Sequence, residues 1–183
     1  GVDGTHPDLI GKVLAGKSFV EASPVDLAAN ADSDLCGHGT AVAGLAAAST
    51  NNGLGIAGLD WQARILPVRV IDQATENCQF GFIEDLIEAI QYAADAGAKI
   101  INVSLGTADF SQALRDAVVY AKNKGSMVVA AAGNGGSIIY PAAFTEAIAV
   151  GASNQSDVVA AFSSAGPELD LLAPGVAVHT TCA

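Results

Sequence analysis

Short apolar runs alternate along this chain with segments of helical periodicity. The runs consist mainly of Val, Ile, Leu and Ala, with few of the regularly alternating polar residues that mark a half-exposed strand. Strands of this kind are buried on both faces, as in parallel sheets covered by helices. Six runs fit this description: 13–19, 65–71, 99–105, 127–131, 147–151 and 169–172. The pattern predicts a three-layer α/β/α fold with a mostly parallel central sheet.

Three segments between these runs are predicted to be helices. Residues 38–49 are almost all small, whereas 82–96 and 109–124 carry apolar residues at a helical period. Asp109 or Ser111 can cap the start of the third helix. Because the active crevice of a parallel sheet lies at the carboxyl ends of its strands, the residues that follow each run are the candidates for a site.

The composition fits one domain spanning residues 1–183. Hydrophobic residues make up 51% of the chain and aromatic residues only 5%, so the core must consist of Ala, Val, Ile and Leu. The formal net charge of −11 repels phosphate backbones, and no apolar run approaches the roughly 20 residues that cross a bilayer. No nucleic-acid partner and no membrane partner is therefore expected.

His38 is the first candidate for chemistry. It lies between Gly37 and Gly39 at the predicted start of the small-residue helix, where bare backbone would let its imidazole reach a substrate as a general base. The alternative is a core histidine that is hydrogen-bonded to a backbone carbonyl.

Two strand ends supply further candidates. Ser104-Leu105-Gly106 follows one apolar run, and Asn134 lies in the glycine loop 133–136 after the next. A side-chain amide can stabilise an oxyanion, and an open strand edge can pair with an extended peptide. With a histidine base, these features indicate acyl transfer on a peptide substrate.

The chain resembles the subtilisin-like serine proteases (subtilases, peptidase family S8) over nearly its whole length. The similarity is carried by five strings in order, each weak alone but specific together: Gly1-Val2-Asp3-Gly4-Thr5-His6-Pro7-Asp8-Leu9, Gly37-His38-Gly39-Thr40-Ala41-Val42-Ala43-Gly44, Ala130-Ala131-Ala132-Gly133-Asn134, Ala161-Phe162-Ser163-Ser164-Ala165-Gly166 and Leu172-Ala173-Pro174-Gly175-Val176. The resemblance implies a serine-type endopeptidase that acts on polypeptides.

The resemblance also implies site residues. His38 would be the general base and Asn134 the oxyanion donor. The walls of the main specificity pocket, which would favour large uncharged side chains, would be Ser104, Leu105, Gly106, Ala131, Ala132 and Gly133. The opposite edge gripping the substrate would be Asn77, Cys78, Gln79 and Phe80.

Two motifs of the family are missing from these 183 residues. The catalytic aspartate is expected two residues before Gly1, and the serine motif Gly-Thr-Ser-Met-Ala does not occur. Asp3 lies in the turn after the aspartate motif, and Ser163 and Ser164 belong to a different stretch, so none of the three is assigned to the triad. The chain is thus expected to be part of a peptidase S8 catalytic domain and to be inactive by itself.

A structural calcium site is also implied by the resemblance. Oxygen ligands on a rigid glycine-rich loop suit Ca²⁺, and the alternative is an Asx-rich turn without an ion. The implied ligands are the side chains of Asp8 and Asn52 and the carbonyl groups of Thr50, Leu54 and Ile56.

The remaining expectations concern cysteines and cellular context. Cys36 and Cys78 lie in loops that some secreted subtilases bridge, so they form either a disulfide or two free thiols, and Cys182 is left over. The resemblance further implies a secreted, extracellular monomer made with an upstream inhibitory propeptide.

The sequence argues against two other classes of function. A non-catalytic subtilase-fold binding protein would have a changed residue at the missing aspartate or serine, and the intact His38 and Asn134 argue against it. A dinucleotide-binding protein would need Gly-x-Gly-x-x-Gly after a first strand, which this sequence lacks.

Overall fold

The structure is a computed structural model in which the chain forms two compact units. It describes residues 1–20, 34, 36–71 and 81–182. The first unit comprises Gly1–Ala89 and His179–Ala183, and the second comprises Ile90–Val178. Whether the two units act as one domain, as the composition suggests, stays a prediction. None of the helices in the part described is long and apolar enough to cross a membrane.

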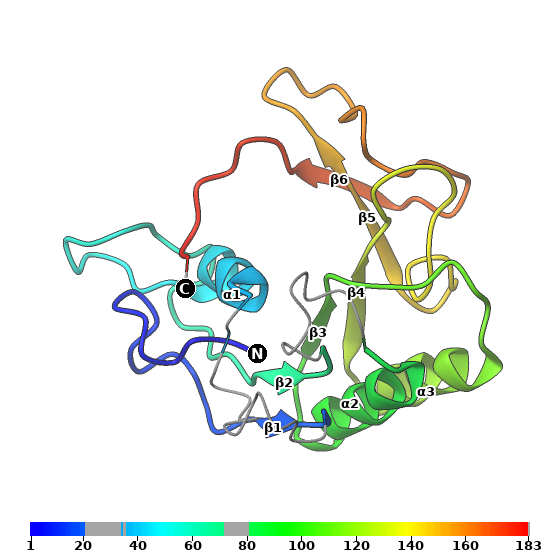
Figure 1. The fold of residues 1–183 in the computed structure, drawn as a ribbon, viewed down its shortest axis with the longest axis horizontal. Helices are drawn as coiled ribbons and strands as arrows, with labels where there is room; N and C mark the ends of the chain where they lie inside the picture. Colours follow the sequence, from blue (N-terminus) through cyan, green and yellow to red (C-terminus); the bar gives the residue numbers. More distant parts are fainter. Residues whose placement is uncertain (21–33, 35, 72–80, 183) are drawn as a thin grey trace. The chain divides into compact units, whose positions relative to one another are not determined.

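The first unit contains a short parallel sheet, helix α1 (His38–Ala47) and the beginning of helix α2 (Ile83–Asp95) (Figure 1). Strand β1, Lys17–Ser18, pairs in parallel with β2, Val68–Arg69. An isolated parallel bridge joins Val13 to Ile65, so the two predicted runs do lie side by side, although their regular strands are shorter than predicted. Val13 and Ile65 pack against the buried cluster of Val2, Leu9 and Ala43.

Helix α1, His38–Ala47, is made of small residues because its neighbours lie very close. A Cβ atom on Gly44 would lie 2.1 Å from Oγ1 of Thr181, and one on Gly39 would lie 1.8 Å from the carbonyl oxygen of Gly1. The Thr181 hydroxyl also donates to the carbonyl of Thr40 at 2.7 Å. Residues 39 and 44 must therefore be glycine, because Gly1 packs against α1 at residue 39 and Thr181 packs against it at residue 44.

The second unit is built on a four-stranded sheet with the order β3-β4-β5-β6, in which every neighbouring pair is parallel (Figure 1). The parallel sheet predicted from the apolar runs is confirmed here. Its strands are Ile100–Val103, Met127–Ala131, Ile148–Ser153 and Leu171–Pro174.

Strand β6 begins two residues later than predicted. The backbone N–H of Asp170 donates to the carbonyl of Ala149 at 3.1 Å, and its carboxylate accepts from the N–H of Ala149 at 2.8 Å. Asp170 thus fixes the point where pairing begins, and the ladder then runs from Leu171 to Pro174 beside β5.

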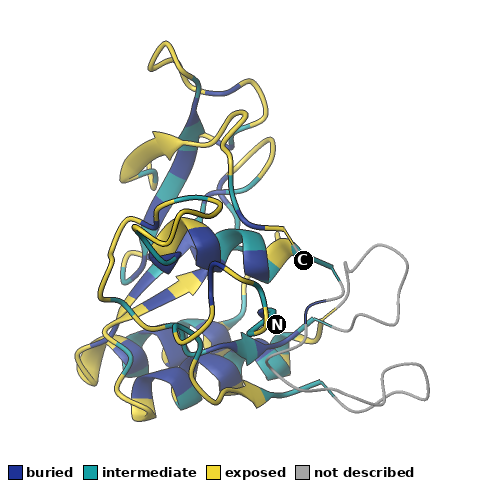
Figure 2. Ribbon diagram, turned by 90° about the vertical axis from the view of Figure 1, so that its left-hand side faces the viewer, coloured by how far each residue is buried: buried dark blue, intermediate teal, exposed yellow. Residues whose placement is uncertain are grey.

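Two helices belong to the central part of the chain. Helix α2, Ile83–Asp95, runs from the first unit into the second, and α3, Gln112–Asn123, packs against β4. Buried and exposed residues alternate along these elements (Figure 2). The buried stripe of α3 consists of Leu114, Ala117, Val118 and Ala121. Of the two predicted caps, Ser111 is the one used: its hydroxyl accepts from the N–H of Leu114 at 3.3 Å.

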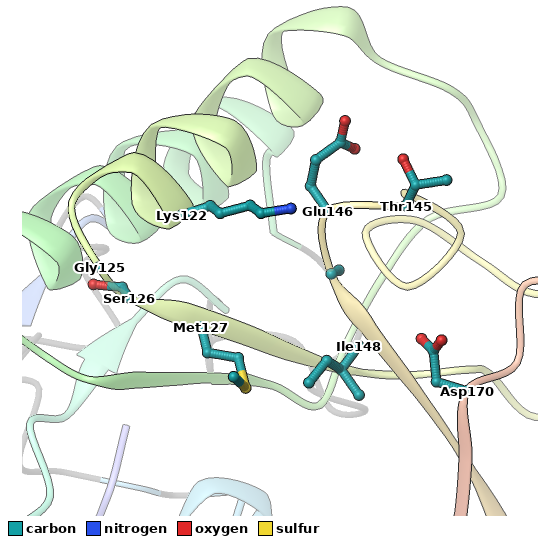
Figure 3. Close-up of a pocket in the computed structure, with 9 residues that line it drawn as sticks. Lys122, Gly125, Ser126, Met127, Thr145, Glu146, Ile148 and Asp170 are labelled. Atoms are coloured by element: carbon teal, nitrogen blue, oxygen red, sulfur yellow. The ribbon is translucent and has the colours of Figure 1, made fainter.

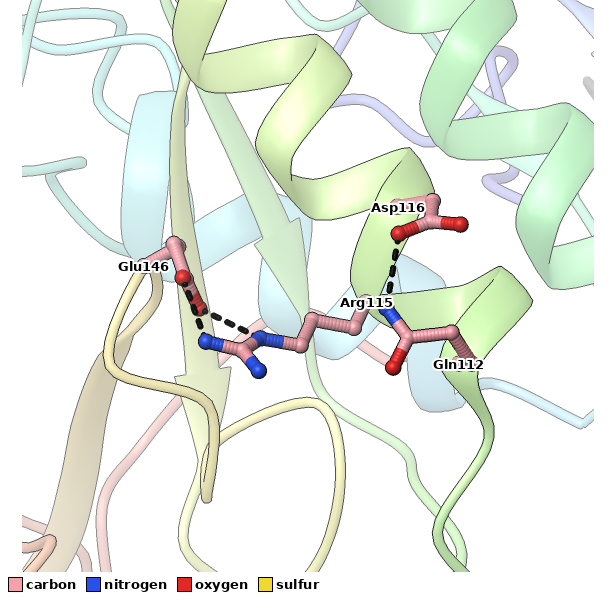
Figure 4. A network of polar contacts seen from close by, with 4 residues as sticks. All are labelled: Gln112, Arg115, Asp116 and Glu146. Carbon is pink, nitrogen blue, oxygen red and sulfur yellow. Dashed lines mark hydrogen bonds and ion pairs between the residues drawn. The ribbon is translucent and has the colours of Figure 1, made fainter.

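An ion pair ties α3 to the turn before β5 (Figure 4). The guanidinium of Arg115 donates to both carboxylate oxygens of Glu146, at 3.2 and 2.9 Å. This guanidinium holds the pKa of Glu146 below its ordinary value. On the same helix, Gln112 donates to Asp116 at 2.8 Å.

Candidate active site

His38 is exposed at the first residue of α1. Gly37, which precedes it, has φ 72°, a left-handed conformation that glycine adopts without strain. Within the described residues the imidazole makes no hydrogen bond. The alternative of a buried, internally hydrogen-bonded histidine is therefore wrong.

A buried carboxylate organises the turn that carries His38. Asp34 accepts hydrogen bonds from the N–H of Gly37 at 3.1 Å, and from the N–H and the hydroxyl of Thr40 at 2.7 and 2.8 Å. The Thr40 hydroxyl accepts in turn from the N–H of Asp3 at 2.9 Å. Asp34 thereby accepts hydrogen bonds from N–H groups at the start of α1, which have no acceptor within the helix itself.

Asp3 has a local role in the turn at the start of the chain. Its carboxylate accepts from the hydroxyl and the N–H of Thr5, at 2.7 and 2.8 Å. The hydrogen bond from the Thr5 hydroxyl is the main cause that lowers the pKa of Asp3. These contacts are those of a turn residue, the role expected for Asp3.

Asn134 is exposed in the second unit, in the loop that follows β4. Gly133, Gly135 and Gly136 have φ values of 113°, 126° and 72°, so this loop has a backbone that L side chains rarely adopt. No residue in the described stretches hydrogen-bonds to the Asn134 side chain. Its amide is therefore free to donate to a bound molecule.

The two predicted pocket walls lie at the same end of one sheet, next to the carboxyl ends of two neighbouring strands. Strands β3 and β4 are parallel neighbours with Val103 opposite Ala130. The stretches that end them therefore lie side by side at the carboxyl ends of the strands. One wall consists of Ser104, Leu105 and Gly106, and the other of Ala131, Ala132 and Gly133.

The structure adds a residue that the sequence did not indicate. Thr107 and Tyr140 form an antiparallel bridge, which places Ile139 between the two walls. A Cβ atom on Gly106 would lie 2.8 Å from Cδ1 of Ile139, and one on Gly133 would lie 3.3 Å from its Cγ atoms. Ile139 thus helps to fill the space beside both glycines, together with the Tyr140 carbonyl and the Ser164 hydroxyl. No local signal marks it, because its position arises from pairing between distant residues.

Two residues of the proposed calcium site, Asn52 and Ile56, hydrogen-bond to the buried carboxylate of Asp8 in the first unit. Asp8 is 1% exposed. Its carboxylate accepts from the amide of Asn52 and from the N–H of Ile56, both at 2.8 Å. Gly55 has φ 42°, and a Cβ atom there would lie 1.8 Å from the Asp8 carboxylate. The loop can close over Asp8 only because residue 55 is glycine.

This oxygen set fits a hard cation. The carbonyl groups of Thr50, Leu54 and Ile56 accept no hydrogen bond from the residues that are described, so three oxygens remain available beside the carboxylate. The Asn52 amide now donates to Asp8 and its oxygen accepts from the N–H of Leu54 at 3.1 Å. Asn52 would have to turn its oxygen toward a bound ion.

The structure describes two of the three cysteines and none of the predicted opposite substrate edge. Cys36 takes part in a disulfide bond and Cys182 is an exposed free thiol, so a free thiol at Cys36 is excluded. The predicted opposite substrate edge, Asn77, Cys78, Gln79 and Phe80, lies outside the described residues.

A pocket of about 480 Å³ lies at the other end of the second unit's strands (Figure 3). Lys122, Glu146 and Asp170 supply its charged groups. It lies at the amino ends of β4 and β5, away from the glycine loop, and is therefore not the candidate site. No cluster of three or more His, Cys, Asp or Glu side chains suited to a metal occurs among the residues in 1–20, 34, 36–71 and 81–182.

Comparison with known proteins agrees with this geometry. The family model described as "Subtilase family" matches residues 1–183. The chain is 49% identical over 183 residues to the "Thermophilic serine proteinase" of Bacillus sp. (strain AK1) and 46% identical over 183 residues to Thermitase of Thermoactinomyces vulgaris. These alignments cover 99% of this chain, but 43% and 62% of the two relatives.

Solved structures show the same fold. Sphericase superposes with a TM-score of 0.85 at 34% identity, covering 100% of this chain and 66% of that one. The "S41 Psychrophilic Protease" superposes at 0.84 and 34% identity, covering 100% and 65%. The predicted α/β class is thus confirmed. With its histidine and asparagine motifs, its parallel sheet and a family match along its whole length, the chain belongs to the subtilase family, peptidase family S8.

Proposed function

We propose that this chain is the part of a secreted serine endopeptidase that supplies the general base and the oxyanion donor. The observation that carries the proposal is the exposure of both His38 and Asn134. His38 begins α1 directly after Gly37, and Asn134 lies in the glycine loop that follows β4. Relatives named as a serine proteinase and as Thermitase support the same class of reaction.

In this proposal His38 takes the proton of a serine hydroxyl supplied from outside the 183 residues. The serine oxygen bonds to the carbonyl carbon of the substrate, and the carbonyl oxygen becomes an oxyanion that accepts a hydrogen bond from the Asn134 amide. His38 then gives its proton to the leaving amine as the peptide bond breaks. Asp34 supports this step by fixing the first turn of α1.

The second unit would bind the side chain of the substrate next to the cleaved bond. The two walls contribute small residues and backbone, and Ile139 lies between them. An apolar pocket whose depth is limited by a branched side chain favours uncharged side chains over charged ones, because a charge there would lose its hydration without a partner.

A structural calcium ion is part of the proposal. Asp8, Asn52 and the carbonyl groups of Thr50, Leu54 and Ile56 would hold it, and a bound Ca²⁺ would tie the loop to the turn at Asp8. Two observations support the site: Asp8 supplies a buried carboxylate, and three carbonyl groups of the loop accept no hydrogen bond from the described residues.

The experiment compares four proteins on a peptide substrate with a chromogenic leaving group. They are the 183-residue chain, the chain extended to include the aspartate and serine motifs of its gene, and His38→Ala and Asn134→Ala variants of the extended protein. The extended protein is expected to hydrolyse the substrate, and the 183-residue chain is not.

His38→Ala is expected to lower kcat by about 10⁴-fold or more, and Asn134→Ala by about 10²- to 10³-fold. An extended protein whose gene lacks either motif, or whose hydrolysis survives His38→Ala, would contradict the proposal. The chain would then be a binding protein with the subtilase fold. Appearance of activity in the culture medium tests secretion.

A further inference from the structure

The loop that carries Asn134 is held by one buried serine. Ser164 is 0% exposed. Its hydroxyl donates to the carbonyl oxygen of Gly135 at 3.0 Å and accepts from the N–H of the same residue at 3.2 Å. Its backbone N–H donates to the carbonyl of Gly133 at 3.0 Å. Ser164 therefore holds the residue before Asn134 and the residue after it.

This loop needs such support because its own sequence is permissive. Gly133 and Gly135 have φ values of 113° and 126°, and glycine loses more backbone freedom on folding than any other residue. The fit is close: a Cβ atom on Gly133 would lie 2.8 Å from the Ser164 hydroxyl oxygen. A larger residue at 133 would push the serine away from the loop.

The Asn134 side chain has no hydrogen-bond partner within the described stretches. Its position is consequently set by the backbone on either side of it, and three hydrogen bonds between Ser164 and Gly133 or Gly135 hold that backbone. The neighbouring Ser163 does something else. Its hydroxyl accepts from the N–H of Ala152 at 3.0 Å and donates to the carbonyl of Ser164 at 3.2 Å, and among the described residues it makes no hydrogen bond to 133–136.

We infer that Ser164 is a positioning residue for the oxyanion donor: it fixes the loop so that the Asn134 amide lies where negative charge develops. The inference rests on the proposed function of Asn134. Ser164 is not itself a nucleophile, because it is fully buried and its hydroxyl both donates to and accepts from Gly135. Its effect on catalysis must pass through Asn134.

The test is a double-mutant cycle in the extended protein, with Ser164→Ala, Asn134→Ala and the double variant. Ser164→Ala is expected to lower kcat by about 10- to 100-fold, since a displacement of about 1 Å can cost 10²-fold, with KM unchanged within about threefold. In the Asn134→Ala background the same substitution is expected to change kcat by less than about threefold. Ser163→Ala, the matched control, should leave kcat within about threefold.

Hydrogen exchange gives a readout that does not need activity. In the 183-residue chain, Ser164→Ala is expected to speed exchange of the Gly135 amide by about 10-fold or more, and Ser163→Ala is not. If Ser164→Ala does not fold, Ser164→Cys replaces it, since its thiol is a weak donor and acceptor and should give a smaller change of the same kind.

The outcomes separate this inference from the proposed function. Loss of kcat by the same factor in both backgrounds would overturn the inference, because the effect would not pass through Asn134. So would a Ser164→Ala variant with unchanged kcat and unchanged Gly135 exchange. Full activity in Asn134→Ala would overturn the oxyanion assignment and the inference with it. Loss of kcat confined to Asn134→Ala would leave the proposed function intact.

Discussion

At the scale of single residues, Ile139 sets the size of the proposed specificity pocket. Gly106 and Gly133 lie on either side of it, and neither could carry a side chain without meeting it. The space beside the two glycines is thus shared by the Ile139 side chain with the Tyr140 carbonyl, on the Gly106 side, and the Ser164 hydroxyl, on the Gly133 side.

Shortening this side chain should change substrate preference. Ile139→Ala removes three carbon atoms between the walls. It is expected to raise kcat/KM for substrates with large aromatic side chains, relative to substrates with smaller ones, by about 10-fold or more. One methylene in an apolar pocket already changes such a ratio by about 10-fold. A series of peptides differing only in the residue before the cleaved bond measures this ratio. An unchanged ratio would show that Ile139 does not line the pocket.

Asp8 is the second residue whose environment gives a prediction. Hydrogen bonds from the Asn52 amide and then from the Ile56 N–H lower the pKa of its carboxyl. Because the folded pKa is depressed, this stabilisation is fully present above about pH 4, the unfolded value. It is lost as the pH falls through the folded value.

Asp8→Asn is therefore expected to lower the free energy of unfolding at pH 7 by about 1–3 kcal/mol. The deficit should begin to shrink below about pH 4, where the unfolded carboxyl takes up a proton, and should be lost once the pH has fallen through the lower folded pKa. Urea denaturation at a series of pH values measures both effects. A deficit of the same size at pH 3 and pH 7 would mean that the charge of Asp8 is not what stabilises the loop.

At the scale of elements, α1 is shaped by close packing rather than by helix propensity. Its glycines are poor helix formers, yet Gly44 lies against Thr181 near the other end of the chain. On an isolated helix, replacing this glycine with alanine would add about 1 kcal/mol of stability.

In this protein Gly44→Ala is expected to be destabilising, because the new Cβ would lie 2.1 Å from the Thr181 hydroxyl oxygen and 2.9 Å from its Cβ. A loss of about 1–3 kcal/mol is the usual cost of overpacking. Thermal and urea unfolding measure it, and Thr181→Gly in the same chain should restore most of the loss. A more stable Gly44→Ala variant would show that the C-terminal segment does not pack on α1.

At the scale of the whole molecule, the candidate residues are divided between the two compact units of the chain. The first unit carries His38 and the loop around Asp8, and the second carries Asn134, the pocket walls and Ser164. The chain spans 43% and 62% of its two named relatives, so the activity of the whole protein is tested only in the extended protein.

Calcium should stabilise the chain as a whole if the loop around Asp8 binds it. Addition of millimolar Ca²⁺ is expected to raise the unfolding temperature, because an ion that binds only the folded state stabilises it by mass action. Scanning calorimetry with and without a chelator measures the change. Asp8→Asn should abolish it, whereas Asp60→Asn, on an exposed turn of the same unit, should not. A rise that persists in Asp8→Asn would place the ion elsewhere.

The sequence alone predicted the family and most of the elements, whereas the chemistry of the site stays a prediction. Helices α2 and α3 and strands β3, β4 and β5 lie within three residues of the predicted ranges, because burial of an apolar face depends on local spacing. Helix α1, predicted from its run of small residues, begins at the predicted residue and ends two residues earlier. The family motifs likewise indicated His38, Asn134 and both pocket walls, since glycines and polar residues at strand ends are visible in the order of the residues.

Tertiary structure decided how these pieces are held. The predicted strands at 13–19 and 65–71 are two-residue strands in the structure, and β6 begins directly after Asp170. The length of a strand depends on the hydrogen-bond partners that the neighbouring strand offers, and the residue pattern does not show these partners. The roles of Ile139 and Ser164 depend on contacts between residues about 30 positions apart in the chain. No spacing rule reports such contacts, because they exist only once the sheet has brought the loops together.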